Sequence, residues 1–187
     1  MSATPKTNGF PDQFLISEES SNHSPATLKL FALLVQETSD VLTAADINYK
    51  PLTWNRASEE IYGLKAEQVI GKDLREFINI HYTGTNRDEV RKTIQTKGEW
   101  RGEAWFVRPT DRKTITLLMC FKELKDASGE LLGFLISATD ISERKEAESR
   151  LIESEQRFRD VAESSPAMIW LSDENDITIY ANKKWME

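Results

Sequence analysis

The fold is decided by the stretch from Gly98 to Lys145, GEWRGEAWFVRPTDRKTITLLMCFKELKDASGELLGFLISATDISERK. It contains three runs rich in β-branched and aromatic residues, at 99–108, 114–124 and 131–139. The last two runs are joined by Asp126-Ala127-Ser128-Gly129, a turn with glycine where a positive φ is favoured. We therefore expect three consecutive antiparallel strands whose alternate residues point to opposite faces.

The residues before this stretch predict a helix and then a hairpin. Ser24-Pro25 is typical of a helix start, with the serine as N-cap and proline at the first helical position. The stripe of apolar residues that follows runs from Leu28 to Val35. Apolar runs at 41–45 and 51–54, separated by a turn-like segment, predict the hairpin.

Short helices are predicted between the hairpin and the three strands. Asn55 begins one that ends at Gly63, and a second, around 65–69, stops at Gly71. A capping box at 86–89 begins a third, which ends at Gly98. This order predicts an α+β fold: one five-stranded antiparallel sheet with short helices on one face, flanked by an N-terminal helix and a C-terminal linker helix.

The linker helix is predicted to begin at a second capping box, Asp140-Ile141-Ser142-Glu143. Glu–Arg pairs four residues apart support it. A narrow apolar seam follows the same helix, formed by Ala147, Leu151, Ser154, Phe158 and Val161. Because the seam is short, two interpretations stay open, a coiled-coil relay and a solvated spacer.

An internal repeat follows the linker. The segment 161–165 resembles 35–39 at an offset of 126 residues, and Asn182 matches Asn55 at an offset of 127, which predicts a one-residue insertion between them. The second copy reaches only its first hairpin and helix. Since a sheet without its last three strands cannot close a core, we expect chain beyond Glu187 or a partner to complete it.

Bulk composition excludes several classes of protein. The chain has 187 residues and a formal net charge of −7, which argues against a nucleic-acid surface. Its single cysteine, Cys120, excludes an internal disulfide and favours a reducing compartment. No apolar run is long enough to cross a membrane, so we expect a cytoplasmic module without membrane contact. Residues 1–23 predict a disordered arm.

These features together resemble the PAS sensor domains with their C-terminal PAC segment. The matching motifs are Trp54-Asn55-Arg56-Ala57, Gly71-Lys72-Asp73-Leu74, Gly98-Glu99-Trp100-Arg101-Gly102-Glu103, Ser128-Gly129-Glu130 and Asp140-Ile141-Ser142-Glu143-Arg144-Lys145. The resemblance covers 28–145, and a second copy begins at Phe158, as in multi-PAS bacterial sensory proteins of the histidine kinase type. The chain departs from the family at 109–112, where Lys-Asp-Gly is usual.

The resemblance implies four parts: an arm at 1–23, a PAS domain with PAC segment at 24–140, a helical linker at 141–163 and the start of a second PAS domain at 164–187. It also implies a sensor that detects a small ligand or partner and relays the signal to an output domain in the same polypeptide. A histidine kinase is the favoured output. The alternative is a ligand-free dimerisation and relay module, upstream of a cyclic-dinucleotide enzyme. The relay residues would be Asp140, Ile141 and Glu143.

No catalytic or metal-binding set is visible in the sequence, so we expect this segment not to be an enzyme. His81 lies before the third short helix, where haem-binding relatives would not place their ligand. Cys120 lies on a strand, whereas photosensing relatives bond flavin through a cysteine in the helical region. We therefore expect neither haem nor covalently bound flavin, and the cofactor is left unnamed.

The resemblance also suggests where a ligand would bind, between the inner face of the sheet and the 86–97 helix. Val90 and Ile94 would supply the helix wall, and alternation along the strands gives the other candidates, Ala104, Phe106, Leu117, Met119, Phe121, Phe134 and Ile136. Nearly all are apolar, and no convergent polar groups are evident. A core filled by these side chains therefore stays open as the alternative to a pocket.

The opposite face of the sheet also carries apolar residues, and an exposed apolar face would be an interaction site. The helix over 28–35, from the same chain or a second one, is the natural cover. We therefore expect a homodimer whose interface includes Leu28, Phe31, Val35, Leu118 and Leu135.

Overall fold

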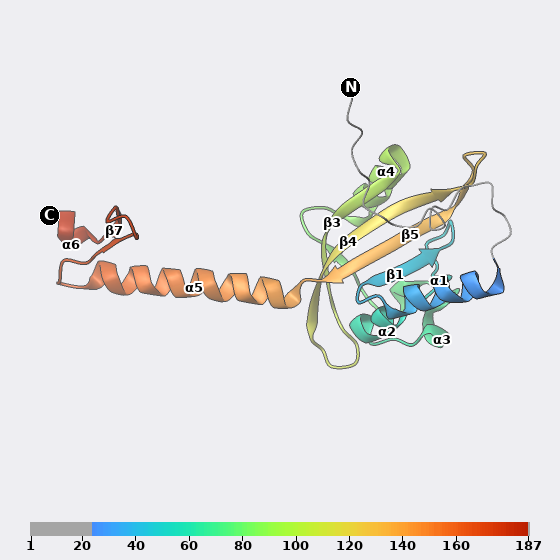
Figure 1. Cartoon of the computed structure of the whole chain (residues 1–187), viewed down its shortest axis with the longest axis horizontal. Helices are drawn as coiled ribbons and strands as arrows, with labels where there is room; N and C mark the ends of the chain where they lie inside the picture. Colours follow the sequence, from blue (N-terminus) through green and yellow to red (C-terminus); the bar gives the residue numbers. More distant parts are fainter. Residues whose placement is uncertain (1–23, 187) are drawn as a thin grey trace, which may run out of the picture.

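The computed structural model describes residues 24–186, so the arm predicted for residues 1–23 lies outside the described residues. The first domain contains five strands and the helices between them (Figure 1). In chain order the elements are α1 (Pro25–Glu37), β1 (Val41–Ala45), α2 (Arg56–Tyr62), α3 (Ala66–Val69), the 3-10 helix η2 (Leu74–Glu76), β2 (His81–Tyr82), α4 (Arg87–Lys97), β3 (Glu99–Val107), β4 (Thr114–Lys125) and β5 (Leu131–Asp140).

The five strands form one antiparallel sheet in the order β1-β5-β4-β3-β2, which confirms the predicted fold class. One of the five strands differs from the prediction. Residues 51–54 form only an isolated bridge, Ala45 with Pro51, and β2 supplies the fifth strand by pairing with β3. The prediction was wrong because the Trp54 indole turns into the core and donates a hydrogen bond to the Leu64 carbonyl oxygen at 2.9 Å.

The helix starts use the N-cap residues that the sequence predicted, but the capping box at 86–89 does not form, because the Glu89 carboxylate accepts from the Thr85 hydroxyl and not from the Asn86 N–H. The Ser24 hydroxyl accepts a hydrogen bond from the Thr27 N–H and begins α1. Asn55 and Asn86 cap α2 and α4 through their side-chain oxygens. Gly98 ends α4 with φ of +77°, a left-handed conformation that lets the chain enter β3 at the next residue.

The core lies on one face of the sheet. In β4 the buried residues are Ile115, Leu117, Met119 and Phe121, whereas Leu118 and Cys120 between them are half-buried. The predicted alternation is therefore correct for this strand.

The linker helix α5 (Ser142–Ser164) projects from the first domain and leads to β6 (Trp170–Ser172), β7 (Thr178–Ala181) and α6 (Lys183–Met186) (Figure 1). It does not begin with the predicted capping box. Ile141 is the N-cap residue, and its apolar side chain makes no capping hydrogen bond. The reason is that Ile141 is only 6% exposed, so core packing sets the start of the helix at Ser142.

The repeat is confirmed, but without the predicted insertion. Nδ2 of Asn55 donates to the Val35 carbonyl oxygen, and Nδ2 of Asn182 donates to that of Ala162. Val35 therefore corresponds to Ala162, not Val161, and both pairs share the offset of 127. The turns at Asp46 and Asp173 match at the same offset, since each aspartate N–H donates to the carbonyl oxygen four residues on.

The two-stranded β6–β7 unit leaves its apolar residues in solvent, as expected for a sheet with two strands. Within residues 24–186, no helix is both long and apolar enough to cross a membrane.

Candidate functional site

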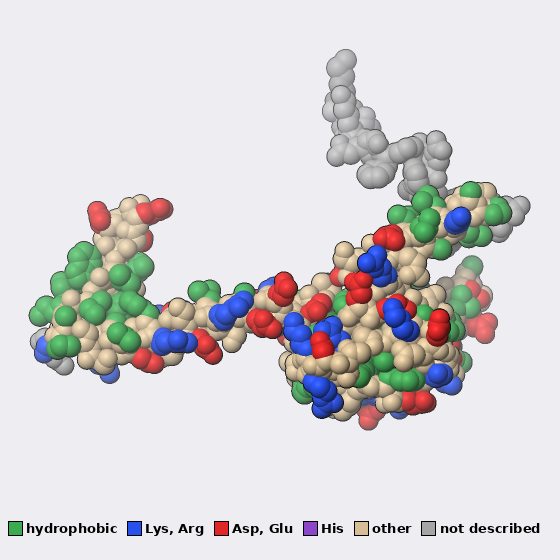
Figure 2. All heavy atoms as spheres, turned by 90° about the horizontal axis from the view of Figure 1, so that it is seen from below, with side chains coloured by type: hydrophobic (Ala, Val, Ile, Leu, Met, Phe, Trp, Pro, Cys, Tyr) green, Lys and Arg blue, Asp and Glu red, His purple; other side chains and the backbone are tan. Residues whose placement is uncertain are grey.

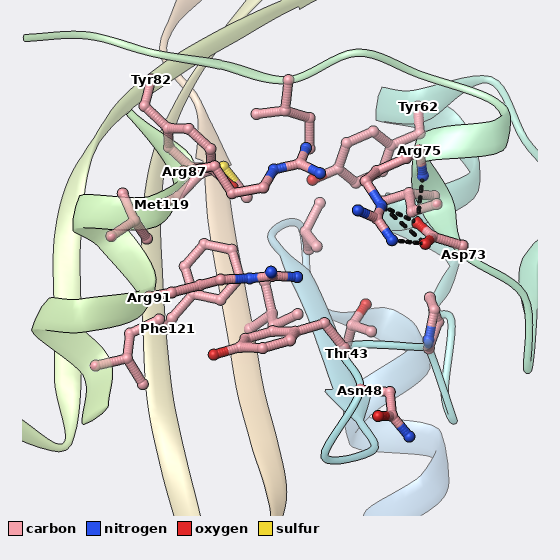
Figure 3. Close-up of a pocket in the computed structure, with 18 of the residues that line it drawn as sticks. Thr43, Asn48, Tyr62, Asp73, Arg75, Tyr82, Arg87, Arg91, Met119 and Phe121 are labelled. Atoms are coloured by element: carbon pink, nitrogen blue, oxygen red, sulfur yellow. Dashed lines mark hydrogen bonds and ion pairs between the residues drawn. The ribbon is translucent and has the colours of Figure 1, made fainter. Parts of the chain in front are cut away.

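A cavity of about 90 Å³ lies between α4 and the inner face of the sheet (Figure 3). Its apolar wall includes five of the predicted pocket residues, listed here: Val90, Ile94, Met119, Phe121 and Ile136. The other four predicted residues, Ala104, Phe106, Leu117 and Phe134, do not line it. They are at most 4% exposed and fill the core beside the cavity, with Phe134 stacked on Tyr49 at 4.2 Å between ring centroids. Packing thus divides the predicted set into wall and core.

The cavity also has a polar side, which the sequence analysis missed. Three guanidinium groups, from Arg75, Arg87 and Arg91, line it against a single carboxylate, that of Asp73. Figure 3 shows the Arg87 and Arg91 side chains reaching from α4 toward Arg75 on the opposite wall. The spacing 87, 90, 91, 94 places two arginines on the apolar face of α4, a signal that was present in the sequence.

Asp73 already pairs with one of these cations. Its carboxylate accepts hydrogen bonds from the Arg75 guanidinium and from the Arg75 backbone N–H at 3.0 Å. This pairing lowers the pKa of Asp73 to about 2. In the part of the chain that the structure describes, no ion pair is found for Arg87 or Arg91.

Three tyrosines, Tyr49, Tyr62 and Tyr82, also line the cavity. Burial raises the pKa of Tyr82, while the cations of Arg87 and Arg91 act against that shift. The Arg91 guanidinium lies 5.1 Å from the ring centroid of Tyr49. Tyr62 is only 2% exposed, and burial raises the pKa of its hydroxyl as well. All three phenols are therefore neutral hydrogen-bonding groups at neutral pH.

Thr43, on β1, also lines the cavity. It is 2% exposed, and its hydroxyl oxygen has no hydrogen-bond partner among the described residues. An unpartnered buried hydroxyl is costly, so native proteins usually supply it with water or a ligand.

A second functional feature is the junction between β5 and α5. The Thr116 N–H donates to the Ser142 hydroxyl at 2.9 Å, and the Ile141 N–H donates to the Thr116 carbonyl oxygen at 2.9 Å. Asp140 accepts from the Ser142 N–H at 2.8 Å. Lys145, in the second turn of α5, pairs with Glu103 of β3 at 2.8 Å. The start of α5 is thus bonded to three strands of the sheet.

Of the three predicted relay residues, two lie in this junction. Asp140 and Ile141 make the contacts described, whereas Glu143 is exposed in the first turn of α5. Ser142, which is 5% exposed, was not among the predicted relay residues. The sequence analysis assigned Ser142 to the capping box of α5. Its hydrogen bond to Thr116, 26 residues earlier, cannot be predicted from neighbouring residues.

The predicted dimer residues fall on two separate surfaces. Leu118 and Leu135 are half-buried on the outer face of the sheet. Leu28 is 56% exposed on α1, whereas Phe31 and Val35 are half-buried. Helix α1 packs against α2 and has no buried residue. Figure 2 shows apolar side chains gathered over α1 and over the segment after α5.

His81 and Cys120, the two residues that the sequence analysis considered for haem and flavin, lie in packing contacts. His81 stacks on Trp105 at 4.2 Å between ring centroids, and Cys120 is half-buried on β4. Among residues 24–186, no three histidine, cysteine or acidic side chains are grouped so that they could hold a metal ion.

Two family models match the chain, both described as PAS domain, over residues 41–143 and 156–187. The first match spans more than half of the chain. The chain therefore belongs to the PAS family, with one PAS domain followed by part of a second, and it is a sensory and signalling module of that class.

The relatives support the same fold. The PAS domain of a protein from Colwellia psychrerythraea is 24% identical, with a TM-score of 0.53 over 62% of this chain and 98% of that one. The PAS domain of the fruit-fly ELK potassium channel is 15% identical, with a TM-score of 0.51 over 62% and 97%. An uncharacterized Sinorhizobium fredii protein, y4lL, is 37% identical over 59 residues, 32% of this chain and 7% of that protein.

Proposed function

We propose that the first PAS domain senses a small ligand in the cavity and relays its presence through α5 to an output domain in the same polypeptide. The observation that carries the proposal is that β4 contributes to both features. Met119 and Phe121 line the cavity, and Thr116 of the same strand holds the start of α5. At about 3.3 Å per residue, Met119 and Thr116 are only about 10 Å apart along the strand.

The relay would work because packed elements move as units. A ligand that displaces Met119 shifts β4, and the two hydrogen bonds at Thr116 transmit that shift to Ile141 and Ser142. The projecting helix α5 then carries a tilt or rotation away from the domain (Figure 1). A histidine kinase is the output that we favour, in the cytoplasm, with no chemistry performed by this segment.

Native mass spectrometry of freshly purified protein tests the binding half of the proposal. We expect added mass that denaturation releases. Hydrogen exchange of the loaded and stripped forms then tests the relay, with slower or faster exchange expected at the Ile141 N–H. Added mass with identical exchange at this junction would support binding and refute the relay.

A second candidate function is a ligand-free dimerisation and relay module, upstream of a cyclic-dinucleotide enzyme. The exposed apolar residues of α1 and α5 favour it, since Leu34 is 57% and Leu151 70% exposed. This reading predicts no added mass together with a dimer in light scattering. A protein that stays monomeric at high concentration would count against it.

A further inference from the structure

We propose that the cavity recognises a small aromatic carboxylate, whose carboxylate group binds Arg87 and Arg91 and whose ring occupies the apolar wall. This inference names the ligand class of the sensor proposed above and rests on that function. It begins from an imbalance of charge. The chain carries a net charge of −7, yet the cavity has three guanidinium groups and one carboxylate.

Two of the three cations are available to a ligand. The Asp73 carboxylate is taken up by Arg75 through both of its oxygens. Arg87 and Arg91 have no ion pair within the described residues, although both are half-buried. Guanidinium groups prefer bidentate hydrogen bonds to carboxylates, and partial burial weakens the competition from water.

The remaining groups around these cations would not repel an anion. The phenols of Tyr49 and Tyr82 are neutral, because burial raises their pKa values. Glu123, which acts on Tyr49 from a distance, is neutralised by its 2.7 Å ion pair with Lys125. The field inside the cavity is therefore set by the arginines.

The apolar side of the cavity indicates the body of the ligand. Aliphatic side chains line this side together with five aromatic rings, those of Tyr49, Trp54, Tyr62, Tyr82 and Phe121. A volume of about 90 Å³ excludes a nucleotide and leaves room for at most one small ring, whose charged substituent would lie toward the arginines. Stacked or edge-to-face contacts with such a ring are favourable.

The Thr43 hydroxyl is an independent sign of a ligand. It lines the same cavity, it is 2% exposed, and it has no partner among the described residues. A polar substituent on the ring or an oxygen of the carboxylate would supply the missing hydrogen bond. The cavity thus offers two charged donors, one polar anchor and an aromatic wall.

The experiment is a titration of the whole chain with sodium benzoate, benzamide and inorganic phosphate, followed by isothermal calorimetry and by the methyl NMR signal of Met119. Benzamide keeps the shape of benzoate and lacks its charge. We expect benzoate to bind at least about tenfold more tightly than benzamide, because charge-assisted hydrogen bonds are the stronger ones. Phosphate, without a ring, should bind more weakly than benzoate.

Variants identify the residues responsible. Arg91→Gln and Arg87→Gln should each reduce the benzoate-to-benzamide preference toward one while benzamide still shifts the Met119 signal, which shows that the cavity is intact. Arg101→Gln, at an exposed arginine on the outer face of β3, is the matched control and should leave the preference unchanged.

Equal affinities for benzoate and benzamide, no benzoate binding, a preference that survives Arg91→Gln, or phosphate binding as tight as benzoate would each overturn the inference. The proposed function fails separately. If benzamide occupies the cavity and alters the Thr116 and Ile141 amides, the sensor stands without the anion specificity. If benzoate binds and those amides do not respond, the ligand class stands without the relay.

Discussion

The backbone N–H of Thr116 in β4 donates a hydrogen bond of 2.9 Å to the side-chain hydroxyl of Ser142, the first residue of α5. The bond joins the strand that borders the cavity to the helix that leaves the domain. Ser142 is 5% exposed, so water cannot readily replace this contact.

Ser142→Ala should loosen the start of α5 and lower the free energy of unfolding by about 1–3 kcal/mol, since the Thr116 N–H loses its partner. Urea denaturation measures the stability, and hydrogen exchange measures the Thr116 amide. Ser154→Ala, at an exposed serine of the same helix, is the control and should change neither. Unaltered exchange at Thr116 in Ser142→Ala would contradict the role assigned to this bond.

Asn55→Ala should destabilise the first domain by about 2–4 kcal/mol because it removes a buried hydrogen-bond network. Asn55 is 1% exposed, and its amide nitrogen donates to the carbonyl oxygens of Val35 and Asp40. The repeat supplies the matched control. Asn182→Ala removes the equivalent network after α5 and should leave the melting temperature of the first domain unchanged, as measured by circular dichroism. Equal losses from both variants would argue against two independent units.

Thr43→Val should raise the stability of the ligand-free protein by about 1 kcal/mol, because the buried hydroxyl gains nothing to offset its desolvation. Thr53→Val is the informative counterpart. The Thr53 hydroxyl accepts a hydrogen bond from the Ala44 N–H at 2.8 Å, so its loss should destabilise. Thermal unfolding compares the two. A destabilised Thr43→Val protein would mean that its hydroxyl already has a partner.

The Asp73–Arg75 pair predicts a pH dependence. The pKa of Asp73 is about 2 in the folded protein, below its ordinary value of 3.8. A depressed pKa means that the folded state stabilises the ionised form, so this contribution is complete above pH 4 and is lost as the pH falls toward 2. Asp73→Asn should therefore have a lower urea midpoint than the natural chain at pH 7, and this difference should shrink toward pH 2.

Asp176→Asn serves as the control for that measurement, because Asp176 lies in the turn of the second unit at φ of +62°, where asparagine is equally suited. It should leave the acid dependence of the first domain as it was. A constant difference between Asp73→Asn and the natural chain from pH 7 to pH 2 would exclude the pair as its source.

Much of the fold follows from local sequence signals. The caps at Ser24, Asn55 and Asn86 are local chemistry, and the alternation in β4 identifies the inner face without any structure. The fifth strand was misassigned for a physical reason. His81 and Tyr82 form a strand two residues long, which has no periodicity, and only pairing with β3 defines it.

The candidate site was less accessible to the sequence for a related reason. The alternation of apolar residues along the strands predicted Met119, Phe121 and Ile136, because every second side chain of a strand points to the same face of the sheet. It could not separate them from Leu117, which is equally apolar and fully buried, since that depends on where α4 packs. Arg75 joins the cavity from the 3-10 helix η2, and no spacing rule links it to α4.

The central claim is that occupancy of the cavity reaches α5 through β4. Xenon is a neutral probe small enough for the apolar side of the cavity, and it tests the claim without any assumption about charge. The measurement is NMR of the chain under xenon pressure, with the Met119 methyl group as the reporter of occupancy and the Thr116 and Ile141 amides as reporters of the junction. The account predicts that all three signals shift together and that Ser142→Ala weakens the response at Ile141. A shifted Met119 signal with unmoved Thr116 and Ile141 amides would contradict it.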